Sequence, residues 1–159
     1  MAPMRANYHT HTTFCDGEQS PADMAQAARA AGFDALGFSS HAPFPAGMPW
    51  GVQPEALEAY AAEIRRLQKV WAGTMDIHLG MEIDWFPPEI RPADGSFDAL
   101  GLDYTIGSVH LVGFEGVKAF TVDGPSADLE AGIAAAGGAR RVYREYYRRL
   151  GELILDGGF

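Results

Sequence analysis

The chain has 159 residues, 47% of them hydrophobic, which is enough to bury one ordinary core and argues against a wholly disordered protein. Its 12 lysines and arginines against 21 acidic residues give a formal net charge of −9, so long nucleic acids and anionic membranes are poor partners. No apolar signal-peptide core or membrane-spanning run occurs, and the single cysteine, Cys15, suits a reducing compartment. We therefore expect a cytoplasmic protein.

The first half of the sequence alternates between strand and helix patterns. Residues 5–11 are short, aromatic and β-prone, and an alanine-rich helix is predicted over 22–33, with Gly32 near its end. A buried strand is predicted over 34–41. The segment 55–73 has its apolar residues at helical spacing, which predicts a long amphipathic helix.

The second half continues this alternation. A third strand is predicted within 75–85, ending near Glu82, and a fourth within 99–112, ending at His110. The segment 139–159 has an apolar face at helical spacing and predicts a final helix.

This order of elements predicts an α/β protein with a parallel sheet, organised as four βα units. Polar motif residues recur at the strand ends every 30 to 40 residues, as they do in a βα barrel. A closed barrel requires about 200 residues or more, so we expect the units that would close it to be absent from this chain.

The polar residues at the predicted strand ends suggest a metal site. In a βα barrel the carboxyl ends of the strands meet on one face. Two residues separated by one position on a strand have side chains on the same face, so His9 and His11 can reach one cation. The candidate ligands are His9, His11, Asp16, His41, Glu82 and His110.

Imidazole and carboxylate ligands suit Zn²⁺, Mn²⁺ or Fe²⁺, and the sequence does not choose among them. Glu82 ends an apolar strand, where a buried charge is costly unless a cation compensates it. An H-x-H pair by itself is more often an ordinary pair of strand histidines, and it is the recurrence at four strand ends that favours a metal site. His78, near the start of its strand, is expected to be structural.

Four segments resemble, in order and spacing, successive motifs of the polymerase and histidinol phosphatase (PHP) superfamily. They are "HTHTTFCDG", "GFSSHAPFP", "GMEIDWFP" and "IGSVHLV". Within the superfamily the chain is most similar to the monofunctional histidinol-phosphate phosphatases. The resemblance implies the N-terminal part of a distorted (β/α)7 barrel that holds up to three divalent ions.

The resemblance also implies the role of each ligand. His9 and His11 would bind the first metal, Glu82 would bridge the first and second, and His110 would bind the second. Asp16 and His41 would bind the third. The later family motifs, G-H-x-D and D-x-H, do not occur in residues 1–159, so we expect one PHP domain that is incomplete at its C-terminus.

Three further residues are candidates for contacts with a substrate. Arg140 and Arg141, at the start of the last predicted helix, are candidates to contact phosphate, although an exposed basic pair is the commoner case. Trp50 is a candidate to stack on an imidazole ring or simply to cover the core. Cys15 lacks the basic surroundings of a nucleophilic thiolate and is expected to be structural.

The function implied by the resemblance is hydrolysis of a phosphomonoester, L-histidinol phosphate, by a metal-held hydroxide, in histidine biosynthesis. One alternative is a PHP phosphoesterase that acts on a nucleotide, a nucleic acid end or phosphotyrosine. Another is an inactive metal-binding fragment, stabilised by association with a second copy because its strand edges are unpaired. A homodimer is therefore a candidate assembly.

Overall fold

The computed structural model describes residues 3–44, 50–92 and 95–157. The chain forms two compact units. The first consists of Met1–Ile83 and Gly95–Ile106, and the second of Asp84–Asp94 and Gly107–Phe159. Each unit is described by itself.

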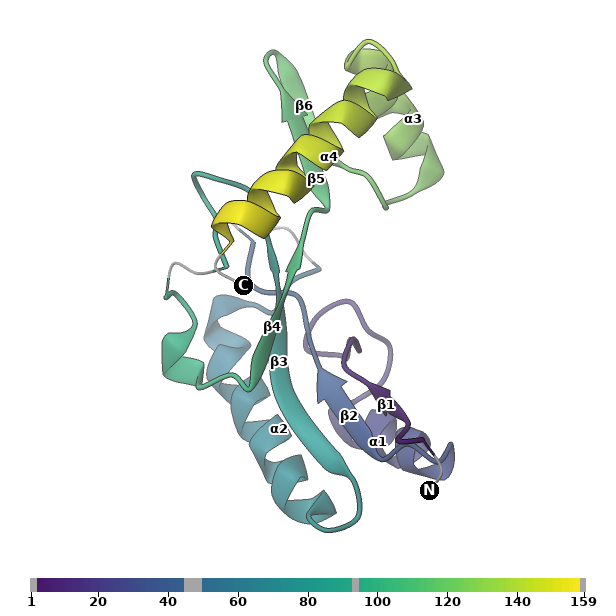
Figure 1. Ribbon diagram of the computed structural model, residues 1–159, viewed down its shortest axis with the longest axis vertical. Helices are drawn as coiled ribbons and strands as arrows, with labels where there is room; N and C mark the ends of the chain where they lie inside the picture. The colour runs from purple at the N-terminus through teal and green to yellow at the C-terminus, as the bar shows by residue number, and fades with distance from the viewer. Residues whose placement is uncertain (1–2, 45–49, 93–94, 158–159) are drawn as a thin grey trace. The chain divides into compact units, whose positions relative to one another are not determined.

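The main sheet has four strands in the order β1-β2-β3-β4. Their bounds are Ala6–Asn7, Ala35–Phe38, Asp76–Asp84 and Tyr104–Ser108. β1 pairs in parallel with β2, and β2 with β3, so successive strands along the chain are neighbours in the sheet (Figure 1). The predicted parallel sheet is therefore present.

Two helices of the first unit connect these strands. α1 (Pro21–Ala30) follows β1 and begins at Ser20, whose hydroxyl accepts a hydrogen bond from the backbone N–H of Asp23. α2 (Leu57–Trp71) follows β2 after a short 3₁₀ turn, η1 (Pro54–Ala56). α2 buries Tyr60, Ile64 and Leu67, as its sequence pattern predicted. β3 is followed by the 3₁₀ turn η2 (Asp98–Leu100) rather than by a long helix.

The second unit contains a hairpin that the sequence pattern did not reveal. β5 (Leu111–Phe114) and β6 (Val117–Thr121) pair antiparallel, and Gly116 in the turn has a φ of 74°. α3 (Ser126–Ala135) packs on β6, and α4 (Ala139–Asp156) packs on β5 and α3 (Figure 1). The predicted final helix is thus present.

Two small apolar clusters lie within the second unit. Trp85, Val109 and Leu153 form one cluster, with Tyr146 and Leu150 packed against it. The other is centred on three buried residues from β5, the end of α3 and α4, namely Val112, Ala136 and Val142. α4 therefore buries one face in the unit to which it belongs.

Three strands are shorter than predicted, and one of them is β2, which covers only Ala35–Phe38 of the predicted 34–41. β1 ends at Asn7, so His9 and His11 follow the strand instead of belonging to it. The chain after Asn7 still runs beside β2, held there by hydrogen bonds that involve side chains. The Thr10 hydroxyl donates to the carbonyl of Gly37, and the backbone N–H of Thr10 donates to the Ser39 hydroxyl. β4 ends at Ser108, two residues before His110, and β5 begins at Leu111, directly after His110.

Tyr104 ties three strands of the first unit together. Its side chain lies against β2 and β3: an added Cβ at Gly37 would come within 2.4 Å of its hydroxyl oxygen, and one at Gly80 within 2.2 Å of its ring carbon Cζ. Its hydroxyl donates a hydrogen bond of 2.6 Å to the carbonyl of Tyr8. Because Tyr8 directly precedes His9, Tyr104 helps to hold the segment that carries the first histidines.

None of the described helices combines the length and apolar composition needed to cross a membrane.

Candidate metal centre

Three histidines of the first unit converge on one oxygen of Glu82. Glu82 Oε2 lies 3.0 Å from His9 Nε2, 3.1 Å from His11 Nε2 and 3.3 Å from His41 Nδ1. Glu82 is 2% exposed and His41 is 8% exposed, so the carboxylate has little access to water. Its negative charge needs a compensating positive charge at this place.

The backbone explains why these side chains meet. His41 and Glu82 form a parallel bridge just beyond the end of β2. The N–H of Ala42 donates to the carbonyl of Glu82, and the N–H of Glu82 donates to the carbonyl of Ser40. The segment after β1 is attached to β2 by a hydrogen bond from the N–H of Ser39 to the carbonyl of Thr10, the residue between the two histidines.

The donor atoms fit a divalent ion of the first transition series. His9 Nε2 and His11 Nε2 are 3.1 Å apart, and each is as close to Glu82 Oε2. Metal–nitrogen distances of about 2.0–2.1 Å place neighbouring ligand atoms about 2.8–3.0 Å apart in octahedral coordination and about 3.3–3.4 Å apart in tetrahedral coordination. These three donor atoms therefore have the spacing that one ion requires.

Asp16 adds a second trio of ligand atoms. Its Oδ1 lies 3.1 Å from His11 Nδ1, and its Oδ2 lies 3.7 Å from His41 Nε2. His11, Asp16 and His41 together form a group with the composition of a metal site. A carboxylate bonded to the remote nitrogen of a ligating histidine also fixes the orientation and tautomer of that ring.

The loop that presents Asp16 is held tightly. The N–H groups of Cys15 and Gly17 both donate to the carbonyl of Thr12. A Cβ at Gly17 would lie 2.4 Å from the backbone nitrogen of Thr12, so only glycine allows the loop to close this far. The turn thus brings Asp16 back toward His11.

The charges of the cluster shift the pKa values of its members. Hydrogen bonds with Cys15 and Glu82 raise the pKa of His11 to about 10, despite its partial burial. Burial alone would raise the pKa of Asp16, but the neighbouring His41 and His11 outweigh it and the pKa falls below its usual value. The anionic groups therefore favour the protonated form of His11, and a bound cation would replace that proton.

Cys15 lies beside this cluster. It is half-buried, and its Sγ is 3.7 Å from His11 Nδ1. Burial raises the pKa of the thiol, but hydrogen bonds with His11 and Ser40 outweigh this effect and lower it. From its sequence neighbours Cys15 was expected to be structural, and the contact with His11 was not foreseen.

His110 lies in the second unit, where acidic groups face both ring nitrogens. Asp84, 4% exposed, has its Oδ1 3.0 Å from His110 Nδ1, and the same oxygen accepts a hydrogen bond from the His110 backbone N–H. On the other side, Asp123 Oδ2 is 3.6 Å from His110 Nε2. Sequence reasoning missed Asp123, although an acidic residue soon after a β-prone run was a usable signal.

The three candidate substrate contacts have other neighbours in the structure. Arg141 donates to the carbonyl of Ala136 and lies 4.8 Å from the centre of the Phe114 ring. Arg140 is exposed at the start of α4. Trp50 is half-buried, with its ring centre 6.0 Å from that of Phe44. Their role in binding substrate remains a prediction.

Comparison with known proteins assigns the family. The model of the PHP domain matches residues 7–157. The chain belongs to the PHP domain family. The match covers the segments that carry all six candidate metal ligands of this PHP chain.

Two curated relatives of this PHP domain carry related names. A Deinococcus radiodurans protein named "Probable histidinol-phosphatase" is 36% identical over 142 residues, or 87% of this chain and 52% of the relative. The "Histidinol-phosphatase" of Bacillus subtilis is 29% identical over 153 residues, or 89% of this chain and 57% of the relative. The chain thus spans little more than half the length of these relatives.

A solved structure shows the same fold. It is that of a Listeria monocytogenes protein described as a candidate histidinol phosphatase, with a TM-score of 0.82 and 22% sequence identity. The match covers 94% of this chain and 61% of the Listeria chain. The predicted fold, an α/β arrangement that forms part of a PHP barrel, is therefore confirmed.

Proposed function

We propose that this PHP chain is the metal-binding N-terminal part of a histidinol-phosphatase, which converts L-histidinol phosphate and water into L-histidinol and phosphate. The observation that carries the proposal is the convergence of His9, His11 and His41 on the buried carboxylate of Glu82. The names of the two curated relatives support the choice of substrate.

The proposed site would bind ions through residues already in position. His9 and His11 would bind one ion through their Nε2 atoms, and Glu82 would offer Oε2 to the same ion. Asp16 and His41 would contribute to another ion, while Asp16 orients the His11 ring through Nδ1. In the second unit, His110 is the candidate metal ligand.

Bound divalent ions would lower the pKa of water toward about 7 and neutralise the oxygens of the phosphate ester. Such neutralisation matters because the chain carries a net charge of −9, and the acidic side chains of the site would otherwise repel a phosphate dianion. The histidines would fix the ligand geometry, and the bound ion would compensate the charge of the buried carboxylate. Ions held by His9, His11 and Glu82 would supply an activated water, so the reaction would need no covalent nucleophile from the chain.

The proposal is tested by phosphate release from the purified chain. The protein is stripped with a chelator, reloaded separately with Zn²⁺, Mn²⁺ or Fe²⁺, and incubated with L-histidinol phosphate, a nucleoside monophosphate or phosphotyrosine. We expect metal-dependent release, fastest from L-histidinol phosphate. Faster release from a nucleotide or phosphotyrosine would contradict the choice of L-histidinol phosphate as substrate. If a folded, metal-loaded chain released no phosphate, the chain would be an inactive metal-binding fragment.

A further inference from the structure

Asp84 is the buried acidic neighbour of His110 in the second unit. It is 4% exposed, and its Oδ1 lies 3.0 Å from His110 Nδ1. The same oxygen accepts a hydrogen bond of 3.1 Å from the backbone N–H of His110. One carboxylate oxygen therefore contacts both the backbone and the ring of a single histidine.

The backbone on both sides of this contact is fixed by packing. Trp85, which follows Asp84, donates its N–H to the carbonyl of Ser108 at 2.7 Å. Trp85 also belongs to the same buried apolar cluster as Val109, the residue before His110. The position of Asp84 relative to His110 is therefore set by the surrounding fold and not by the two hydrogen bonds alone.

The hydrogen bond at Nδ1 determines the tautomer of the neutral His110 ring. An ionised carboxylate can only accept, so the ring proton lies on Nδ1 and the lone pair on Nε2. Histidine in water prefers the opposite form, with the proton on Nε2. Asp84 thus makes Nε2 the nitrogen through which His110 can bind a cation, which is the usual effect of a carboxylate bonded to a ligating histidine.

We propose that Asp84 is a positioning residue for a metal ion bound by His110, and that it acts by holding the ring in the Nδ1–H tautomer. The inference rests on the proposed function only in taking His110 as a metal ligand. A role in the backbone alone would need no more than the contact with the N–H of His110. The second contact, at Nδ1, is the one that indicates a role through the ring.

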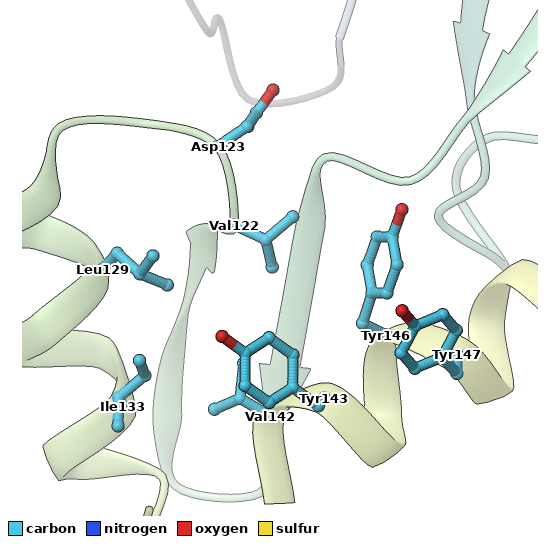
Figure 2. A pocket seen from close by; sticks show the side chains of 8 residues that line it. All are labelled: Val122, Asp123, Leu129, Ile133, Val142, Tyr143, Tyr146 and Tyr147. Atoms are coloured by element: carbon cyan, nitrogen blue, oxygen red, sulfur yellow. The ribbon is translucent and has the colours of Figure 1, made fainter. Parts of the chain in front are cut away.

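Asp123, on the other side of the ring, provides a matched comparison. Its Oδ2 is 3.6 Å from His110 Nε2, and its side chain is 58% exposed. It lies at the edge of a pocket of about 280 Å³, and Figure 2 shows its carboxylate directed away from the side chains of Val122 and Leu129. An acidic group that faces Nε2 favours a proton on Nε2, so Asp123 cannot be the cause of the Nδ1–H tautomer.

The tautomer is measured by ¹⁵N NMR of the histidine rings in the metal-free 159-residue chain, at a pH high enough for the rings to be neutral. The signals of His110 are those missing from a His110→Gln chain. We expect the Nδ1–H form in the wild type and mainly the Nε2–H form in Asp84→Ala. Asp84→Asn should restore the Nδ1–H form, because the backbone N–H of His110 holds the amide oxygen where Oδ1 now lies. Asp123→Asn should keep it, since that change removes only the charge that faces Nε2.

The affinity for Zn²⁺ is the second readout, obtained by adding Zn²⁺ while the His110 signals are followed. Asp84→Ala is expected to weaken binding at His110 by about 10–100-fold, the usual cost of losing a group that orients a metal ligand. Asp84→Asn should weaken it less. Phosphate release enters neither readout, so a failure of this proposal is distinguishable from a failure of the proposed function.

Three results would overturn the proposal. The first is a wild-type His110 ring that carries its proton on Nε2 or does not respond to Zn²⁺. The second is an Asp84→Ala chain that keeps the wild-type tautomer or the wild-type affinity. The third is an Asp84→Asn chain that keeps the tautomer but binds Zn²⁺ as weakly as Asp84→Ala, which would make Asp84 itself a ligand. The first and third results decide the matter even if circular dichroism shows that Asp84→Ala does not fold, the loss of affinity in Asp84→Asn being then compared with the wild type.

Discussion

Replacement of Glu82 by glutamine is expected to weaken divalent-metal binding by at least about 10–100-fold and to abolish metal-dependent phosphate release. The amide has nearly the same shape, but it lacks the negative charge on which the three histidines converge. Loss of a group that merely orients a metal ligand typically costs about 10–100-fold in affinity, so loss of a direct ligand should cost at least as much. Metal content after dialysis, followed by phosphate release, measures both effects.

Glu63→Gln is the matched control for this variant. Glu63 lies on α2 and pairs with Arg66 one turn later on the same helix, away from the proposed ligands. The same chemical change there should leave metal content and phosphate release as in the wild type. If Glu82→Gln retained wild-type metal content, Glu82 would not be a ligand, and the proposed centre would have to be abandoned.

Gly80→Ala is expected to destabilise the chain by about 1–3 kcal/mol, the usual cost of forcing an extra carbon into a packed region. The new Cβ would lie 2.2 Å from Cζ of Tyr104, a distance that real contacts do not reach. The Tyr104 ring must then move, and its hydrogen bond to the Tyr8 carbonyl will weaken. Because Tyr8 precedes His9, a lower metal affinity is also expected.

Urea unfolding measures this loss, with Gly113→Ala as the control. Gly113 also lies in a strand, but a Cβ there would be 3.7 Å from the Ala119 Cβ, which is an ordinary contact. The control should unfold at nearly the same urea concentration as the wild type. Equal stability of the Gly80→Ala and Gly113→Ala chains would contradict the packing described for Tyr104.

The sequence predicted the elements whose periodicity is long and regular. The apolar positions of α2 and α4 repeat at helical spacing over several turns, and both helices are present. Short strands and turns are harder to predict from the sequence, because their patterns extend over only a few residues. The hairpin of β5 and β6 was missed, although two β-prone segments separated by Glu115 and Gly116 provide a hairpin signal.

The sequence predicted the membership of the candidate site better than its internal contacts. Spacing and motif order selected His9, His11, His41 and Glu82, which the structure brings together. No pattern revealed that a single oxygen of Glu82 faces all three rings. Such contacts depend on where the chain lies after β1 ends, which is set by hydrogen bonds between residues distant in sequence, such as Thr10 and Gly37.

The position of Cys15 shows the same dependence on the fold. Its neighbours in sequence, Phe14 and Asp16, gave no sign that the thiol would lie beside His11. The tight turn closed by Gly17 produces that contact. A local sequence pattern could not supply this information.

The most direct test of the metal centre is X-ray absorption spectroscopy of the chain loaded with one equivalent of Zn²⁺. We expect a first shell of nitrogen and oxygen atoms at about 2.0–2.2 Å, with the outer-shell scattering of at least two imidazole rings. Glu82→Gln should reduce this signal, and Glu63→Gln should not. A sulfur shell at about 2.3 Å, which would place Zn²⁺ on Cys15, or a spectrum without imidazole scattering would contradict the proposed centre.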